Sequence, residues 1–167
     1  MLENTVRAEH ARLGAAERTH RTCDSQLRAM RLDIRDRTGE DVIPGHPMFP
    51  WMVRYVSFVV CRFQPRGQRG QTICEARNGF HYKSAIVPFL ECVMIRVPIA
   101  PPGFRKKLDS QWLKGAWVGR ASDSDANVVV HPEGTVAGKF VRWLALENRH
   151  DKDLYKVMFA TATSWKC

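Results

Sequence analysis

Apolar side chains recur at alternating spacings of three and four residues near the start of the chain. The stripe consists of Leu13, Ala16, His20, Cys23, Leu27, Met30 and Ile34, and about half of the positions between them are arginines or acids. Because this spacing places its members on one face of an α-helix, residues 14–37 are predicted to form an Arg-rich helix with one apolar face. Gly39 and Pro44 are predicted to end it.

A second segment, residues 46–63, is apolar on nearly all sides. Pro50 favours a helix start there, because the first turn of a helix needs no amide hydrogen from it. The apolar positions are Met52, Val53, Tyr55, Val56, Phe58, Val59, Val60 and Phe63. Such a helix must be covered on most sides. We expect it to pack on the first helix and on later strands, or to leave apolar surface that drives self-association.

The second half of the chain has the pattern of a small sheet. After a Gly/Arg linker (64–71), a short helix and a turn at Asn78–Gly79 are predicted, and from Phe89 the alternation changes to a period of two. Strands are predicted over residues 89–97, 111–120, 126–131 and 135–144, with a turn at 131–134. These short strands with glycines suggest a small SH3-like β-barrel. Residues 147–158 are predicted to be a closing helix or an extended tail.

Composition restricts the class of protein. The chain has 167 residues, of which 44% are hydrophobic, so a folded core is expected. Five cysteines without a close pair favour reduced thiols over a disulfide framework or a zinc knuckle. The polar N-terminus is no signal peptide, and Arg54 interrupts an apolar run too short to span a membrane. We therefore expect a soluble intracellular protein, located in the nucleus if it is functional.

The net charge of +9 is concentrated in the middle of the chain. Residues 1–41 are balanced, and so are the residues after 120. The basic residues of the segment 42–120 are Arg54, Arg62, Arg66, Arg69, Arg77, Lys83, Arg96, Arg105, Lys106, Lys107, Lys114 and Arg120, against Glu75, Glu91 and Asp109. A localised excess of this kind is typical of a protein that binds a polyanion.

DNA or RNA is therefore the predicted partner of the basic segment. The candidate nucleic-acid-binding residues are Arg54, Arg62, Arg66, Arg69, Arg105, Lys106, Lys107, Lys114 and Arg120. The alternative interpretation is a basic surface that serves only solubility, and we favour nucleic acid over it. An unrelated enzyme is disfavoured, because the sequence has no Gly-x-Ser-x-Gly elbow, no phosphate loop and no Cys/His cluster with ligand spacing.

Glu17 on the first helix has two interpretations. It lies beside the apolar stripe and could point along the edge of a core towards a cleft. It could also be a surface acid that pairs with Arg21 one turn later, which stabilises a helix by a few tenths of a kcal/mol. Periodicity alone favours the surface pair. His20, within the stripe, is interpreted as a histidine at the edge of the core and not as a metal ligand.

Five motifs follow one another in a characteristic order. They are Gly14, Glu17 and Arg18; His46, Pro47, Pro50, Trp51 and Arg54, with Arg62 and Phe63; Thr72, Glu75 and Gly79; Phe89 and Glu91; and Lys107, Leu108, Asp109, Trp112, Gly115, Trp117, Gly119, Ser124 and Asp125. In order and spacing, over about residues 12–165, the series resembles copia-type retrotransposon integrases. The matching part is the C-terminal end of the catalytic core and the barrel that follows it.

The resemblance implies an α+β fold in which two long helices from an incomplete RNase H-like core precede an SH3-like β-barrel. It divides the chain into an unmatched segment (1–12), the helical end of the core (13–80), the barrel (81–146) and a C-terminal helix or tail (147–167). Where the family has asparagine before the helix glycine, this chain has Leu13.

The resemblance also makes Glu17 the last of three metal-binding acids, with Mg²⁺ as the cofactor of the intact family. Both partner aspartates would stand upstream, but the residues before Glu17 include none. Two-metal phosphoryl transfer needs oxygen ligands from several elements. We therefore expect Glu17 to be a catalytic remnant, with no tight Mg²⁺ binding and no activity of the chain by itself.

Two functions remain open at this point. One is a truncated integrase fragment, related to DNA integration, that keeps nucleic-acid binding through residues 42–120. The other is a non-catalytic module, built on the barrel, that binds nucleic acid or another protein. Self-association is expected to be possible, and a membrane is not a predicted partner.

Overall fold

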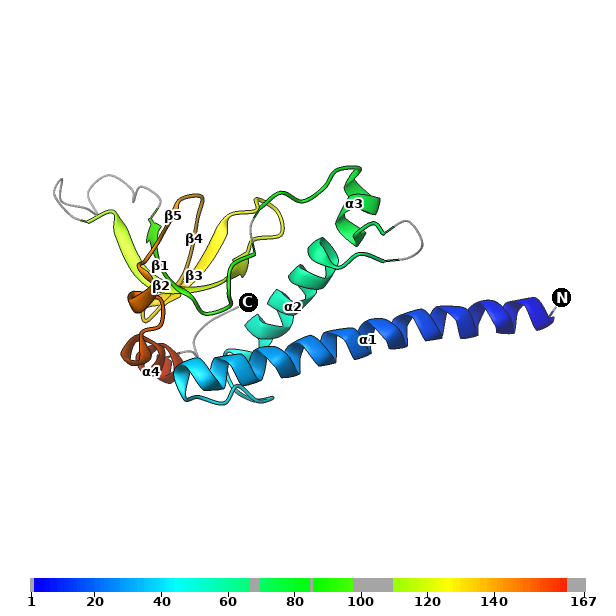
Figure 1. The fold of residues 1–167 in the computed structure, drawn as a ribbon, viewed down its shortest axis with the longest axis horizontal. Helices are drawn as coiled ribbons and strands as arrows, with labels where there is room; N and C mark the ends of the chain where they lie inside the picture. Colours follow the sequence, from blue (N-terminus) through cyan, green and yellow to red (C-terminus); the bar gives the residue numbers. More distant parts are fainter. Residues whose placement is uncertain (1, 67–69, 85, 98–109, 162–167) are drawn as a thin grey trace.

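The computed structural model describes residues 2–66, 70–84, 86–97 and 110–161 (Figure 1). In these ranges the chain is α+β, with four α-helices and a five-stranded antiparallel sheet, as predicted. The elements are α1 (Leu2–Thr38), α2 (Phe49–Phe63), α3 (Ile73–Asn78), β1 (Cys92–Arg96), β2 (Trp112–Arg120), β3 (Asn127–His131), β4 (Gly134–Gly138), β5 (Val141–Trp143), a 3₁₀ turn (Leu146–Asn148) and α4 (Lys152–Thr161). The predicted closing segment is thus a helix.

Helix α1 is longer than the sequence pattern indicated. It begins at Leu2 and runs through Gly14, so the prediction that the helix opens at Gly14 is wrong. A single glycine inside a long run of helix formers costs only about 1 kcal/mol and does not break the helix. The predicted end is confirmed: Thr38 is the last residue, and the amide of Gly39, at φ 82°, donates to the carbonyl of Arg35 over 2.8 Å.

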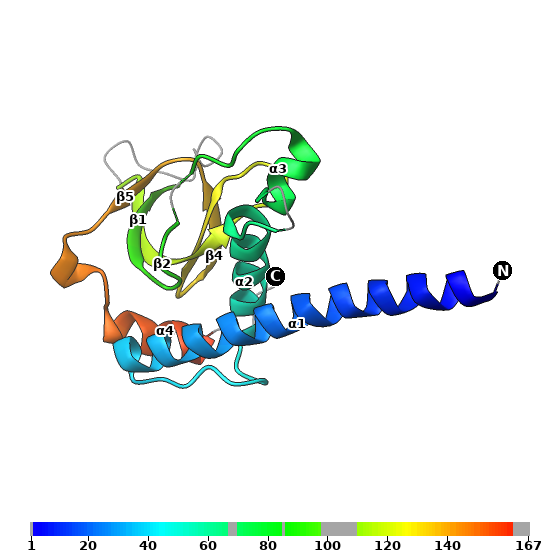
Figure 2. The same ribbon diagram turned by 45° about the vertical axis from the view of Figure 1, so that its right-hand side comes forward.

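Among the stripe residues of α1 whose side chains the structure describes, burial increases towards the C-terminal half. Ile34 is fully buried, and Leu27 and Met30 pack partly against the core. His20 is exposed, which corrects its interpretation as a core-edge residue. In both views the N-terminal half of α1 extends beyond the rest of the molecule (Figures 1 and 2). At about 1.5 Å per residue the whole helix is about 55 Å long.

Helix α2 forms as predicted and is the central support of the sheet. Pro50 lies in its first turn, and its buried residues are Trp51, Met52, Tyr55, Val56, Phe58 and Val60. The helix packs between α1 and β2, and the Tyr55 ring meets the Trp117 ring edge-on, with centroids 5.6 Å apart. The prediction that α2 is covered by the later strands is therefore confirmed. None of the described helices is both long and apolar enough to cross a bilayer.

The strand order in the sheet is β4-β3-β2-β1-β5, with every pair antiparallel. The single strand predicted over 135–144 is in fact two, β4 and β5, which lie on opposite edges of the sheet. Between them the chain turns, and the amide of Arg96 donates to the carbonyl of Phe140 over 3.0 Å. The described residues of β4 and β5 do not pair with each other. The sheet is therefore open and not closed on itself.

One core joins the helices to the sheet. The largest side chains with almost no exposure are Trp117, Tyr155, Phe89, Ile34, Met48, Met52, Leu90, Ile95 and Met158. They come from α1, α2, α4, the strands and the segment before β1, and they belong to a single buried cluster. The helical part and the sheet part thus stabilise each other, because each covers apolar surface of the other.

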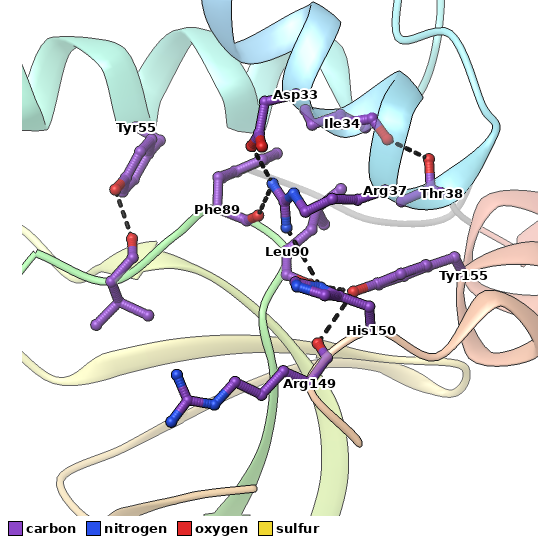
Figure 3. A network of polar contacts seen from close by, with 11 residues as sticks. Asp33, Ile34, Arg37, Thr38, Tyr55, Phe89, Leu90, Arg149, His150 and Tyr155 are labelled. Atoms are coloured by element: carbon purple, nitrogen blue, oxygen red, sulfur yellow. Dashed lines mark hydrogen bonds and ion pairs between the residues drawn. The ribbon is translucent and has the colours of Figure 1, made fainter. Parts of the chain in front are cut away.

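The segment 87–91 is held in place by polar contacts from three helices (Figure 3). The Arg37 guanidinium on α1 donates to the carbonyl of Phe89 over 3.0 Å and to the carboxylate of Asp33. From α2, the Tyr55 hydroxyl donates to the carbonyl of Val87 over 2.5 Å. Burial raises the pKa of Tyr55 to about 12, so this hydroxyl stays protonated. Buried backbone carbonyls outside the strands are satisfied in this way.

Tyr155 on α4 supplies the third of these contacts. Its substitution tests how much such a contact stabilises the fold. Its hydroxyl donates to the carbonyl of Leu90 over 2.5 Å, and the side chain is fully buried. Burial raises the pKa of Tyr155, so the donor persists at all accessible pH values. Tyr155→Phe is expected to lower the free energy of unfolding by about 1–2 kcal/mol, because the Leu90 carbonyl loses its partner in a dry site.

Urea unfolding measures this change, with Tyr82→Phe as the matched control. The Tyr82 hydroxyl donates to Asp125 over 2.8 Å at a half-buried position, where water can replace it. The control is expected to cost less than Tyr155→Phe. Equal losses for the two variants would contradict the role assigned to Tyr155.

Candidate nucleic-acid interface

A groove lies between helix α2 and the C-terminal end of strand β2. We call it the α2–β2 groove. It has a volume of about 230 Å³ and is lined by Arg54, Ser57, Phe58, Cys61, Arg62, Val118, Gly119, Arg120 and Ser122. The α2 members are three or four residues apart, so they share one face of the helix. Three of the predicted nucleic-acid-binding residues, Arg54, Arg62 and Arg120, are brought together here although they lie far apart in the sequence.

Arg62 is the best-placed cation of the groove. Its guanidinium carbon lies 4.3 Å from the centroid of the Phe58 ring and 5.1 Å from that of the Tyr82 ring. Its Nε is buried and has no hydrogen-bond partner. In the described part of the chain no acid pairs with Arg62. The aromatic rings fix the guanidinium plane by cation–π attraction, and no acid competes for its Nη donors.

Arg54 and Arg120 lie on opposite walls of the groove and touch each other. Arg54 Nη2 donates to the carbonyl oxygen of Arg120 over 3.3 Å. Arg120 Nη1 donates to the carbonyl of Asp125 over 3.0 Å, and a carboxylate oxygen of Asp125 lies 3.3 Å away. Arg120 is thus partly neutralised, whereas Arg54 has no ion pair among the described residues.

Two acids lie beside the groove and limit its positive charge. Asp125 pairs with Arg120 and also accepts a hydrogen bond from Tyr82. Backbone amides at Asp123 and Ser124 lower the pKa of the Asp123 carboxyl, and Arg54 adds a smaller attraction. The groove therefore combines two unpaired guanidinium groups with one that Asp125 shares. Its chemistry fits an anion that guanidinium groups can chelate, such as a phosphate.

The remaining predicted contact residues do not join this groove. Lys114 Nζ forms an ion pair with Asp151 at 2.5 Å, near α4. Arg66 donates to the Thr19 hydroxyl over 2.9 Å and so ties the loop after α2 to α1. Four further candidates, Arg69, Arg105, Lys106 and Lys107, lie outside the described residues.

Glu17 lies on the exposed face of the projecting part of α1. Its carboxylate is 2.5 Å from Arg21 Nη2, and the side chain is 63% exposed, which is the surface pair that periodicity favoured. No group of three His, Cys, Asp or Glu side chains that could hold a metal occurs within the described ranges. A lone, ion-paired carboxylate does not fit Mg²⁺, which needs several oxygen ligands in an octahedral array. We derive no reaction step through a metal.

A second hollow, of about 330 Å³, lies between α1, α2 and the segment before β1. It is lined by Gln26, Ala29, Met30, Asp33, Tyr55, Val56, Val59, Ile86, Pro88 and Phe89. Its one charged lining residue is an acid. This hollow is therefore unsuited to a polyanion, in contrast to the α2–β2 groove.

Sequence reasoning missed the aromatic support of the groove. Phe58 precedes Arg62 by one helical turn, and this spacing could have indicated the contact. Tyr82 carries no such signal, because it reaches Arg62 from the loop after α3 through tertiary structure alone. Arg142 on β5 was also missed, since it lies outside the basic segment 42–120.

Comparison of the chain with protein-family models, with curated proteins and with solved structures finds no match.

Proposed function

We propose that this chain binds nucleic acid through the α2–β2 groove, by contacts to the phosphate backbone, and that it has no strand-transfer activity by itself. One observation carries the proposal: the Arg62 guanidinium lines the groove, is held against two aromatic rings and pairs with no acid among the described residues. A phosphate oxygen bound in the groove would gain a charge-assisted hydrogen bond from its Nη atoms.

The groove is suited to a polymer of phosphates more than to a single anion. Arg54, Arg62 and Arg120 line it from two elements, and a concave site with low-dielectric walls concentrates their field. Contacts of this kind bind nucleic acid without reading its sequence. The proposed activity is therefore sequence-independent and strongly dependent on salt.

We also propose a lineage for the chain. The order of motifs from Gly14 to Asp125 supports descent from a copia-type integrase, with α1 and α2 as the end of an RNase H-like core and the open sheet as a relative of the SH3-like barrel. In this lineage Glu17 is the remnant of the third catalytic acid. A functional copy would act on nucleic acid in the nucleus.

The substitution Arg62→Gln tests the proposed function. Fluorescence anisotropy with a labelled DNA duplex, repeated at several salt concentrations, gives the affinity and its salt dependence. Losing one phosphate contact is expected to reduce the slope of log K against log salt by about 0.9, and hence the affinity about eightfold at 0.1 M salt. Arg62→Lys keeps the charge and is expected to keep the slope.

The matched control is Arg28→Gln, which removes the same charge from an exposed position on α1. It is expected to change duplex affinity less than twofold. Equal losses for Arg28→Gln and Arg62→Gln would show that only net charge matters and would overturn the groove as the site. Absence of salt-dependent binding by the unsubstituted chain would overturn the function.

A further inference from the structure

The register of three strands places a second set of basic side chains on one surface. On β1 and β2, Met94 lies opposite Lys114 and Arg96 opposite Trp112, and across β5, Met94 lies opposite Arg142. Residues directly opposite each other in a sheet project to the same side. Met94, Arg96, Trp112, Lys114 and Arg142 therefore form one surface, which we call the basic outer face.

This surface is on the outside of the sheet and is open at one end. The next pair along it, Cys92 and Ala116, is fully buried, and the Cys92 thiol lies 3.5 Å from the Tyr155 hydroxyl of α4. Helix α4 thus covers that end. Arg96 and Arg142, farther along the same strands, are exposed. The alternate residues Val93 and Ile95 project to the opposite side and are buried in the core.

The charges of the basic outer face are largely uncompensated. Arg96 donates to the Gln111 side chain over 3.0 and 3.2 Å, and the Arg142 guanidinium carbon lies 4.1 Å from the centroid of the Trp112 ring. Within the described ranges neither arginine pairs with an acid, and Lys114 alone has an ion pair. Neighbouring like charges on a sheet repel each other, and an anion bound across the face would reduce this electrostatic repulsion.

The stacking of Arg142 on Trp112 indicates which polyanion fits. Nucleobases stack on aromatic rings and on guanidinium planes, and proteins that bind single strands combine such surfaces with positive charge. A duplex buries the faces of its bases against one another and cannot use a stacking surface. The combination of Trp112 with Arg96 and Arg142 therefore favours an unpaired strand.

The basic outer face is distinct from the α2–β2 groove. Trp112 and Arg120 are the two ends of β2, which places them about 26 Å apart along the strand. Figures 1 and 2 show β5 and α2 at opposite sides of the sheet. A single point of contact with a ligand therefore could not involve both the basic outer face and the α2–β2 groove.

We propose that the basic outer face is a second binding site, specific for single-stranded nucleic acid. This proposal rests on the proposed function only in taking nucleic acid as the ligand, because the residues of the outer face are separate from those of the groove. The test is the double substitution Arg96→Gln with Arg142→Gln. Binding is measured by anisotropy with labelled oligo-dT of about 20 nucleotides and with a duplex of equal length. Losing two contacts is expected to weaken oligo-dT binding about 25-fold at 0.1 M salt and to change duplex binding less than twofold.

A second variant, Trp112→Leu, removes the stacking surface without changing charge. It is expected to weaken oligo-dT binding at least about fivefold and to leave the salt slope unchanged. The charge-matched control is the double substitution Arg77→Gln with Lys83→Gln, two exposed positions away from the face. Circular dichroism verifies that each variant keeps the fold.

The possible outcomes separate the two sites. If the outer-face variants leave oligo-dT binding unchanged while Arg62→Gln weakens duplex binding, this inference is wrong and the proposed function stands. If the outer-face variants weaken only oligo-dT binding and Arg62→Gln has no effect on duplex binding, the groove is not the binding site and the proposal for the outer face stands. Equal losses for both ligands, or for the control and outer-face variants, would also overturn a separate single-strand site.

Discussion

Replacing Trp117 with alanine is expected to lower the free energy of unfolding by about 3–5 kcal/mol. The side chain is 1% exposed, and its Nε1 donates to the Asn127 side chain over 3.1 Å. The ring also meets Tyr55 of α2, so it connects the helices to the sheet. Alanine would leave a cavity between rigid elements and would deprive Asn127 Oδ1 of its donor. Because small domains are stable by only about 5–15 kcal/mol, this variant is expected to be close to unfolded at 37 °C.

Chemical unfolding by urea, followed by far-UV circular dichroism, measures the change. Trp143→Ala is the matched control, because Trp143 is 47% exposed on the edge strand β5. The control removes the same atoms and is expected to cost about 1 kcal/mol or less. A similar loss at both positions would show that the core is not centred on Trp117.

Gly115→Ala is expected to destabilise the fold by about 2–3 kcal/mol, although it adds a single methyl group. A Cβ at this position would lie 2.5 Å from the carbonyl oxygen of Val130 and 2.5 Å from Cγ1 of Val129. Both contacts are far inside van der Waals distance. The Val130 oxygen belongs to the backbone of β3, so relief requires β2 and β3 to separate.

The same substitution at Gly14 is expected to have the opposite sign. Gly14 lies in the interior of α1, and an added Cβ meets nothing within 4 Å. Alanine is favoured over glycine in a helix by about 1 kcal/mol, so Gly14→Ala should raise helix content. Thermal and urea unfolding of the two variants compare the effects. A stable Gly115→Ala variant would contradict the close approach of β2 and β3.

Local patterns were sufficient to predict most elements of the fold. Pro50 and the apolar run after it fix α2, because a helix that is apolar on nearly all sides is stable only when covered. The strand β1 follows from period-two alternation, and the turn at Asn78–Gly79 follows from its residue types, with Gly79 in the left-handed region at φ 77°. These features depend on residues close together in the sequence.

Other features depend on tertiary contacts and could not be predicted in this way. The start of α1 was misplaced because Gly14 was interpreted as a helix boundary, whereas a glycine in open space is tolerated. The break between β4 and β5 was missed because residues 135–144 were interpreted as one strand, whereas β4 pairs with β3 and β5 pairs with β1. Sequence alternation contains no information on which edge a strand will join.

The candidate groove, too, could be predicted from the sequence only in part. The basic segment was predicted from charge alone, and it does contain Arg54, Arg62 and Arg120. Which of its members converge depends on how α2 crosses the end of β2, and Lys114 and Arg66 turn out to be engaged elsewhere. The charge count therefore predicted a segment of the chain, and the packing of α2 on β2 determines which of its arginines lie together.

The two halves of the continuous helix α1 are expected to differ in thermodynamic stability, because the N-terminal half projects from the rest of the molecule. Towards its C-terminal end, Ile34 and Arg37 tie the backbone to the cooperative core. The side chains of Glu17 and Arg18 are exposed, and they bond to Arg21 and to the Gly14 carbonyl on neighbouring turns of the same helix. An unsupported helix is only marginally stable in water. The N-terminal turns are therefore expected to open and re-form by local fluctuation while the rest of the protein stays folded.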